Sequence, residues 1–138
     1  MGNAFMQINW LAILAATVAT FILGGVWYGV VTPKFYTIAL GRENLPPQKM
    51  TPLFILGPTV CNLIATITSA VLLRMLNIET IAGAVSFGLL IGVGYIISTC
   101  MMIAINPNFP RPFLYTALNA PNFLISNVMT CVILTVIQ

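Results

Sequence analysis

Long apolar runs without any charged residue alternate with short polar connections along this chain. Four such runs cover residues 8–31, 53–73, 81–105 and 113–137. Each is long enough to cross the roughly 30 Å of hydrocarbon in a bilayer as a helix. Helices satisfy all backbone hydrogen bonds within one segment, and the alternation of a membrane strand is absent. We therefore predict an all-α fold, in which residues 1–138 form one bundle of four transmembrane helices.

Composition and charge agree with a membrane environment. Of the 138 residues, 59% are hydrophobic and only 5% are charged, whereas soluble domains carry about a quarter charged residues. The predicted first and third connections contain four of the five basic residues: Lys34, Arg42, Lys49 and Arg111. The positive-inside rule therefore predicts a multi-pass protein of the cell (inner) membrane with both termini outside. We expect membrane lipid, and not nucleic acid, to be the partner of these charges.

The first connection is the only one long enough to contain a helix of its own. Thr32 can cap a helix, Pro33 suits its first turn, and Gly41 can close it. This pattern predicts a short helix over residues 33–40, lying at the membrane interface. The alternative is an irregular polar loop.

Small residues recur at every fourth position of two predicted helices. The first helix carries Ala12, Ala16, Thr20 and Gly24, with Gly25 and Gly29 on a neighbouring stripe, and the third carries Ala84, Gly88 and Gly92. Lipid gives helices no hydrophobic reason to associate, so close packing of small residues has to supply it. We predict that the first and third helices make their closest contacts through these faces. The alternative is a chance match, because Gly and Ala are common in membrane helices.

Trp27 and Tyr28 stand at the end of the first run, beside its glycines and just before Lys34. Indole and phenol rings have an apolar body and one polar group, which suits the boundary between lipid tails and headgroups. We predict that both residues anchor the first helix at this interface.

Polar side chains follow helical spacing along the second and fourth helices. Among them, Asn62, Thr66, Asn119, Asn122 and Ser126 are our candidate ligand-binding residues. Each of the two helices also contains a proline, Pro58 or Pro121, which removes one backbone hydrogen bond and frees a carbonyl near Phe54 or Ala117. We expect the two polar stripes to face each other, either as a site for a polar solute or as hydrogen bonds between the helices.

Residues that support catalysis or metal binding are missing from the predicted membrane helices. The chain has no His and no Asp, and both Glu residues lie outside the four runs. The three cysteines lack the spacing and the His partners of a metal site, so we read them as small apolar residues. We expect no enzymatic activity, no metal and no cofactor.

Several of these features occur together in one known family. They are the sequence from Gly24 to Trp27 and Tyr28, an aromatic loop segment, the turn "FPRPF", and Asn119-Ala120 followed by Met129. Their order resembles the domain of unknown function 1761 family, and the resemblance covers nearly the whole chain. It implies a small four-span membrane protein and carries no activity. The chain departs from the family pattern at Pro121-Asn122, where Gly-Tyr is expected, and at Thr130, where Gly is expected.

We expect the protein to act through helix–helix interaction, as a homo-oligomer or as a subunit among other membrane proteins. The alternative is a binder or transporter of a small polar or amphipathic solute between the second and fourth helices. The chain resembles the small multidrug exporters in size and number of spans, but it lacks their intramembrane Glu.

Overall fold

The computed structural model describes residues 6–46 and 48–137, and these residues form helices and connections without any strand. Within these ranges, four helices are long and apolar enough to span a membrane: Trp10–Val31, Pro52–Met75, Ile81–Ala104 and Pro112–Val136. Each end lies within two residues of the end predicted from the sequence. The all-α fold with four candidate membrane spans is therefore confirmed.

The first and third spanning helices are not regular α-helices. The first consists of α2 (Trp10–Val26) and a π-helical segment, η1 (Trp27–Val31). The third consists of α5 (Ile81–Ile91), a second π-helical segment, η2 (Gly92–Ile97), and α6 (Ser98–Ala104). A π-helical turn has a wider hydrogen-bond ring than an α-turn, and it changes which side chains share a face. The predictions assumed regular α-helical spacing and therefore missed both segments.

The second and fourth spanning helices are continuous: α4 (Pro52–Met75) and α7 (Pro112–Val136). Both begin with proline, which fits the first turn because the N–H it lacks would have no partner there. Side chains cap the other two spans at their N-termini. The Asn9 side chain accepts hydrogen bonds from the N–H groups of Leu11 and Ala12, and the Thr80 hydroxyl accepts one from Gly83.

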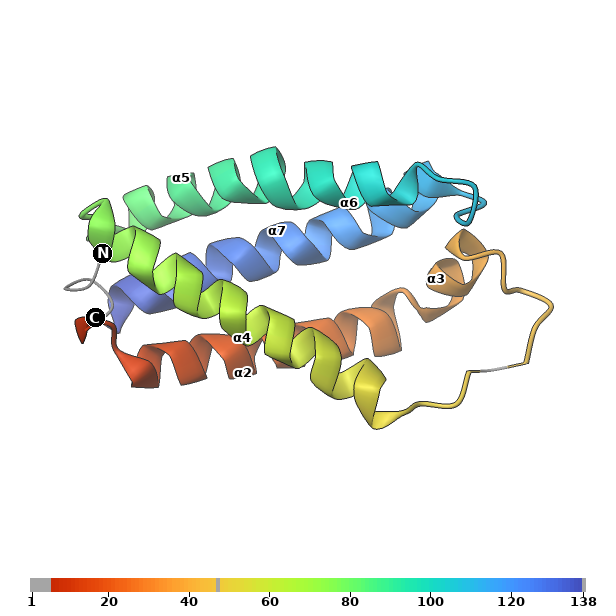
Figure 1. Ribbon diagram of the computed structural model, residues 1–138, viewed down its shortest axis with the longest axis horizontal. Coiled ribbons are helices and arrows are strands. Elements are labelled where there is room, and N and C mark those ends of the chain that lie inside the picture. Colours follow the sequence, from red (N-terminus) through yellow and green to blue (C-terminus); the bar gives the residue numbers. More distant parts are fainter. Residues whose placement is uncertain (1–5, 47, 138) are drawn as a thin grey trace.

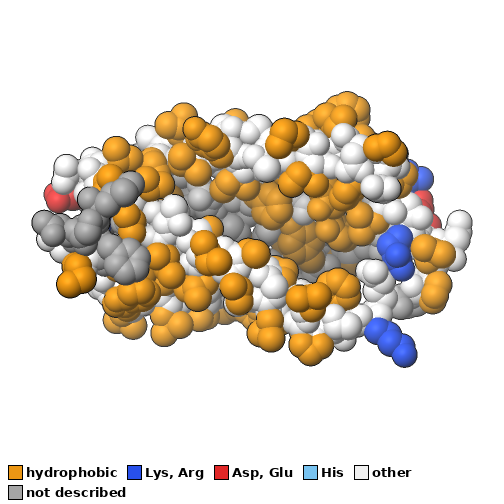
Figure 2. Space-filling view, in the orientation of Figure 1, with side chains coloured by type: hydrophobic (Ala, Val, Ile, Leu, Met, Phe, Trp, Pro, Cys, Tyr) orange, Lys and Arg blue, Asp and Glu red, His pale blue; other side chains and the backbone are white. Residues whose placement is uncertain are grey.

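Helix α7 is the centre of the bundle. It packs against α2, against α4 and against all three parts of the third spanning helix. In Figure 1, α5 and α6 lie on one side of α7 and α2 on the other, while α4 crosses the face toward the viewer. The buried residues of α4 are Thr66, Ala70 and Leu73, all in its C-terminal half. Figure 2 shows hydrophobic side chains along the outside of the bundle, as expected for helices that face lipid.

The two connections that carry most of the basic residues lie together at one end of the bundle. The Arg111 guanidinium donates hydrogen bonds to the Ile38 carbonyl (2.8 Å) and to the Glu43 carboxylate (2.6 Å). Gly41, with a φ of 64°, would place an added Cβ only 2.8 Å from Pro110. Both described chain ends lie at the opposite end (Figure 1), and basic side chains gather at the connection end in Figure 2. This arrangement matches the even number of spans, while the side that faces the cytoplasm stays a prediction.

The helix predicted in the first connection is confirmed as α3 (Pro33–Ala39). Gly41 closes it in the left-handed conformation, as expected. Thr32 precedes the helix, but its hydroxyl donates back to the Trp27 carbonyl (2.9 Å) and makes no capping bond. The threonine thus closes η1 and does not cap α3.

Candidate functional site

Two side-chain hydrogen bonds join η1 to α7, which is distant from it in the sequence. The Trp27 indole N–H donates to the Leu118 carbonyl (2.9 Å), and the Tyr28 hydroxyl donates to Asn119 Oδ1 (2.6 Å). Both aromatic side chains are half-buried. We expected their polar groups to bond to lipid headgroups, but those groups bond to α7 instead, while the position of the two rings at the membrane interface stays a prediction. Both residues belong to the π-helical segment, so this irregular turn of the first spanning helix is the part that contacts α7.

Both polar atoms of the Asn119 side chain have a hydrogen-bond partner at this contact. It is 2% exposed, its Oδ1 accepts from Tyr28, and its Nδ2 donates to the Tyr115 carbonyl (2.7 Å). The hydrogen-bonding capacity of a buried amide is normally used in this way. Asn119 therefore has a structural explanation without any ligand.

Asn122 lies one turn later and is only partly satisfied. It is 5% exposed, and its Nδ2 donates weakly to the Tyr28 hydroxyl (3.4 Å). Its Oδ1 has no hydrogen-bond partner among the described residues. A buried amide oxygen without a donor is unfavourable, so this position can take a hydrogen bond from a small polar group. We call Tyr28, Asn119 and Asn122 the Tyr–Asn node.

The proline of α7 lies inside this contact region. Pro121 has no N–H to give to the carbonyl four residues before it, so we expected a freed carbonyl at Ala117. The carbonyl that binds a side chain is that of the next residue, Leu118, through the Trp27 indole. The proline thus coincides with the place where η1 is fastened to α7.

An aromatic cluster continues from the Tyr–Asn node toward the connection end of the bundle. The ring centroids of Tyr28 and Tyr36 are 5.3 Å apart, those of Tyr36 and Tyr115 are 5.8 Å apart, and those of Phe109 and Tyr115 are 4.7 Å apart. These distances are typical of favourable aromatic pairs. Burial raises the pKa of Tyr36 well above its ordinary value. The cluster brings together η1, α3, the third connection and α7.

The candidate residues of the second helix do not join this site. Asn62 Nδ2 donates to the Thr20 hydroxyl of α2 (2.5 Å), and that hydroxyl donates to the Ala16 carbonyl (2.8 Å). Thr66 is 1% exposed, and its hydroxyl has no hydrogen-bond partner in the described structure. The expectation that the second and fourth helices pair through their polar stripes is wrong for Asn62, because α4 crosses α2 at that position.

Ser126, the last candidate residue on α7, is half-buried and has no hydrogen bond with the other candidates. The neighbouring Asn127 has the role that the sequence analysis missed. Its Nδ2 donates to the Gly88 carbonyl of α5 (2.7 Å). The sequence alone could have indicated this role, because an Asn inside an apolar span needs a polar partner in protein.

The small residues of the third helix face α7. Ala84 is fully buried, a Cβ on Gly88 would lie 2.9 Å from the Val128 Cα, and a Cβ on Gly92 would lie 2.6 Å from a Leu124 methyl. Gly88 and Gly92 therefore allow α5 and η2 to approach the central helix closely. The predicted closest contact between the first and third helices is wrong, because α7 takes this face.

The small residues of the first helix fall into two groups. Ala16 and Thr20 are buried, as expected. Gly24, Gly25 and Gly29 lie in open space, with no atom within 4 Å of an added Cβ. Gly24 is thus a correction to the predicted packing face. The glycines lie on a side of the first spanning helix that no other described part of the bundle covers, while Trp27 and Tyr28 beside them still contact α7.

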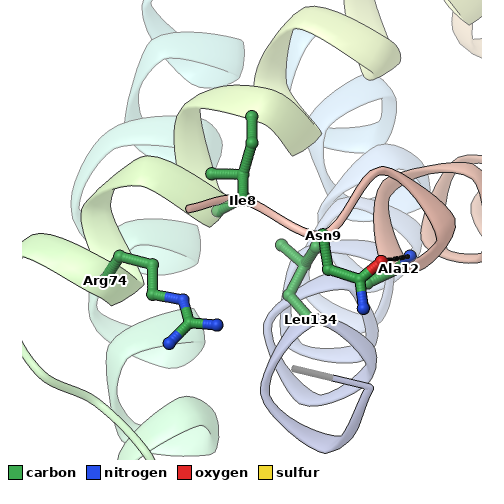
Figure 3. Close-up of a pocket in the computed structure, with 6 residues that line it drawn as sticks. Ile8, Asn9, Ala12, Arg74 and Leu134 are labelled. Atoms are coloured by element: carbon green, nitrogen blue, oxygen red, sulfur yellow. Dashed lines mark hydrogen bonds between the residues drawn. The ribbon is translucent and has the colours of Figure 1, made fainter. Parts of the chain in front are cut away.

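A small pocket lies at the end of the bundle where the described chain ends meet. Figure 3 shows Arg74 of α4 pointing toward Asn9 and Leu134. Ile8 and Ala12 also line this pocket. The volume of the pocket is about 10 Å³, which is room for no more than one water molecule. It is too small to be a ligand site.

The comparisons with known proteins agree with the fold. The sequence model of a family described as "Protein of unknown function (DUF1761)" matches residues 11–135, nearly the whole chain. No curated protein and no solved structure matches the chain.

Proposed function

Because this chain belongs to the family described as proteins of unknown function (DUF1761), whose description carries no activity, we propose from its own surface that it acts through helix–helix association, as a homo-oligomer. The protein has four candidate membrane helices, so the association takes place in the bilayer. The face that carries the proposal is on α2 and η1.

Exposed residues of α2 repeat with alternating spacings of three and four from Leu11 to Gly25, and Gly29 of η1, also exposed, follows four residues later. We call this face the α2 stripe, and its members are Leu11, Leu14, Val18, Phe21, Gly25 and Gly29. Alternating three- and four-residue spacing is the seam of paired helices. Glycines four apart let two membrane helices approach closely. The α2 stripe therefore has the pattern of a helix pairing face, and its members are exposed within the described part of the bundle.

The single observation that supports the proposal most is the open space at Gly25 and Gly29. The chain uses the same spacing at Gly88 and Gly92 for a tight contact inside the bundle. Glycine inside a helix destabilises it by roughly 0.5–1 kcal/mol relative to alanine. A second copy of the chain, placed with its own α2 stripe on this one, would give Gly25 and Gly29 a contact that offsets this penalty.

Cross-linking in the membrane tests this proposal. In a variant without the native cysteines, Phe21→Cys should form disulfide-linked dimers on oxidation, and adding Gly25→Leu and Gly29→Leu should abolish them. Val93→Cys, an exposed apolar position of η2, is the matched control and should not cross-link. Equal cross-linking at both positions, or a monomer by light scattering in mild detergent, would contradict the proposal.

Solute binding is a second candidate, and the unpartnered Oδ1 of Asn122 supports it. Asn122 bonds to Tyr28 of η1, so the proposed position is between η1 and α7, not between the second and fourth helices as the polar stripes suggested. Asn122→Leu removes this acceptor, while Asn62→Leu removes an amide that already bonds to Thr20. Loss of solute uptake in the first variant alone would support a site at Asn122. An equal effect of both variants would contradict it.

A further inference from the structure

A groove of about 440 Å³ lies between the third spanning helix and α7. Its walls include Tyr95, Thr99 and Ile103 from the third helix, and Tyr115 and Phe123 from α7. This volume is within the range of small-molecule sites, roughly 300–1,000 Å³. Tyr95 is 70% exposed and Ile103 is 56% exposed, so the groove opens sideways to the surroundings of the bundle.

The groove lies within the membrane-spanning segments. Along the third helix, Tyr95 is nine residues and Thr99 five residues before the last helical residue, Ala104. At 1.5 Å per residue, these positions are about 13 Å and about 7 Å from the helix end. The groove therefore extends from near the middle of the hydrocarbon to its edge at the connection end. A molecule that enters it comes from the bilayer.

Two hydroxyl groups in the groove have no hydrogen-bond partner among residues 6–46 and 48–137. Tyr95 and Thr99 are four residues apart on one helix, and neither hydroxyl has a hydrogen bond with another described residue. By contrast, the half-buried Thr59 and the exposed Thr68 of α4 donate to carbonyls of their own helix. A hydroxyl in hydrocarbon is unfavourable without a hydrogen bond. Tyr95 and Thr99 can therefore donate to oxygen atoms of a ligand.

The other residues that line the groove indicate which kind of ligand fits it. The rings of Tyr115 and Phe123 offer faces for stacking, and the contacts of Tyr115 with Tyr36 and Phe109 hold its ring in place. No charged residue lines the groove, so nothing compensates a charged headgroup there. A saturated lipid chain would fill the space but would leave both hydroxyls without partners.

From these features we propose that the groove binds a neutral, membrane-soluble ring compound with carbonyl oxygens, of the quinone type. Its ring lies against Tyr115 and Phe123, its carbonyl oxygens accept hydrogen bonds from Tyr95 and Thr99, and its apolar tail extends into lipid past Ile103. This site is separate from the α2 stripe, and it does not depend on the association of chains.

Calorimetric titration with a short-chain benzoquinone that carries one isoprene unit tests the site, with protein-free micelles as the blank. Wild-type protein should bind it saturably. The double variant Tyr95→Phe, Thr99→Val should raise the Kd about tenfold, because two hydrogen bonds are lost while the shape is kept. The matched control is Thr68→Val, whose hydroxyl bonds to its own helix, and it should leave the Kd unchanged.

If the double variant fails to fold, two further binding measurements test the site. Ile103→Trp fills the open side of the groove and should abolish binding. An analogue with a cyclohexane ring and the same tail, which lacks the carbonyl oxygens, should bind at least tenfold more weakly than the quinone. Equal binding of the two compounds, no saturable binding to the wild type, or full binding to Ile103→Trp would each overturn the proposal.

Discussion

The hydroxyl of Tyr28 in η1 donates a 2.6 Å hydrogen bond to the side-chain oxygen of Asn119 in α7, 91 residues later in the chain. Together with the bond from Trp27 to the Leu118 carbonyl, it fastens the end of the first spanning helix to the central one. These two bonds hold the first and last spans together at the end of the bundle where α3 packs.

Tyr28→Phe should destabilise the bundle by about 1 kcal/mol. The change keeps the ring and its contact with Tyr36 but leaves the buried Asn119 Oδ1 without a donor. Chemical unfolding in mild detergent measures the effect. Tyr95→Phe is the matched control, because its hydroxyl is exposed and has no partner among the described residues, and it should change stability little. Equal effects of both variants would show that the Tyr28 bond contributes nothing.

Gly88→Leu should disrupt the packing of the third helix on α7. A Cβ at this position would lie 2.9 Å from the backbone of Val128, and backbone atoms cannot move aside cheaply. We expect a loss of at least 1–3 kcal/mol, the usual range for overpacking. Gly94→Leu is the control, since nothing lies within 4 Å of a Cβ there. A variant Gly88→Leu with unchanged thermal unfolding would contradict the observed α5–α7 contact.

The contact between Glu43 and Arg111 should make the connection end sensitive to acid. A backbone hydrogen bond of its own, and then the Arg111 guanidinium, lower the pKa of the Glu43 carboxyl from its ordinary 4.5. A group with a lowered folded pKa stabilises the fold above its unfolded pKa, and this contribution is lost as the pH falls through the folded pKa. Hydrogen-exchange protection of α3 should therefore decrease below about pH 4.5.

The matched variants for this effect are Glu43→Gln and Glu79→Gln. Glu43→Gln should show the reduced protection of α3 at every pH, because the charge on the contact is gone. Glu79 lies at the opposite end of the bundle, and its replacement should leave the pH dependence of α3 as in the wild type. Protection of α3 that is independent of pH in the wild type would count against the contact in solution.

The connection from residue 33 to residue 51 should lie in the cytoplasm. Four of the five basic residues are at this end of the bundle, which the positive-inside rule assigns to the cytoplasmic side. A single cysteine at Gln48, in a variant without the native cysteines, should react with a membrane-impermeant thiol reagent only after the cells are opened. Labelling from outside intact cells would reverse the orientation.

The sequence alone determined the spans, their ends and the helix in the first connection. A charge-free apolar run of bilayer length has one stable backbone solution, so its type and approximate ends follow from composition. The prolines at residues 33, 52 and 112 and the glycine at residue 41 act locally, and they mark helix ends without help from the tertiary structure.

The tertiary structure alone decided which faces meet. The predictions placed Asn62 opposite α7 and Gly24 against protein, since both positions were read from spacing along a single regular helix, and they placed Trp27 and Tyr28 at headgroups from their position just before Lys34. Two π-helical segments break that spacing, and α4 crosses α2 instead of running along α7. The apolar positions of a span carry little signal for helix rotation or partner, because lipid and protein neighbours are both apolar there, and a polar residue shows only that it needs some partner in protein. The partners of the polar side chains depend on helix rotation and crossing, which exist only once the bundle has formed.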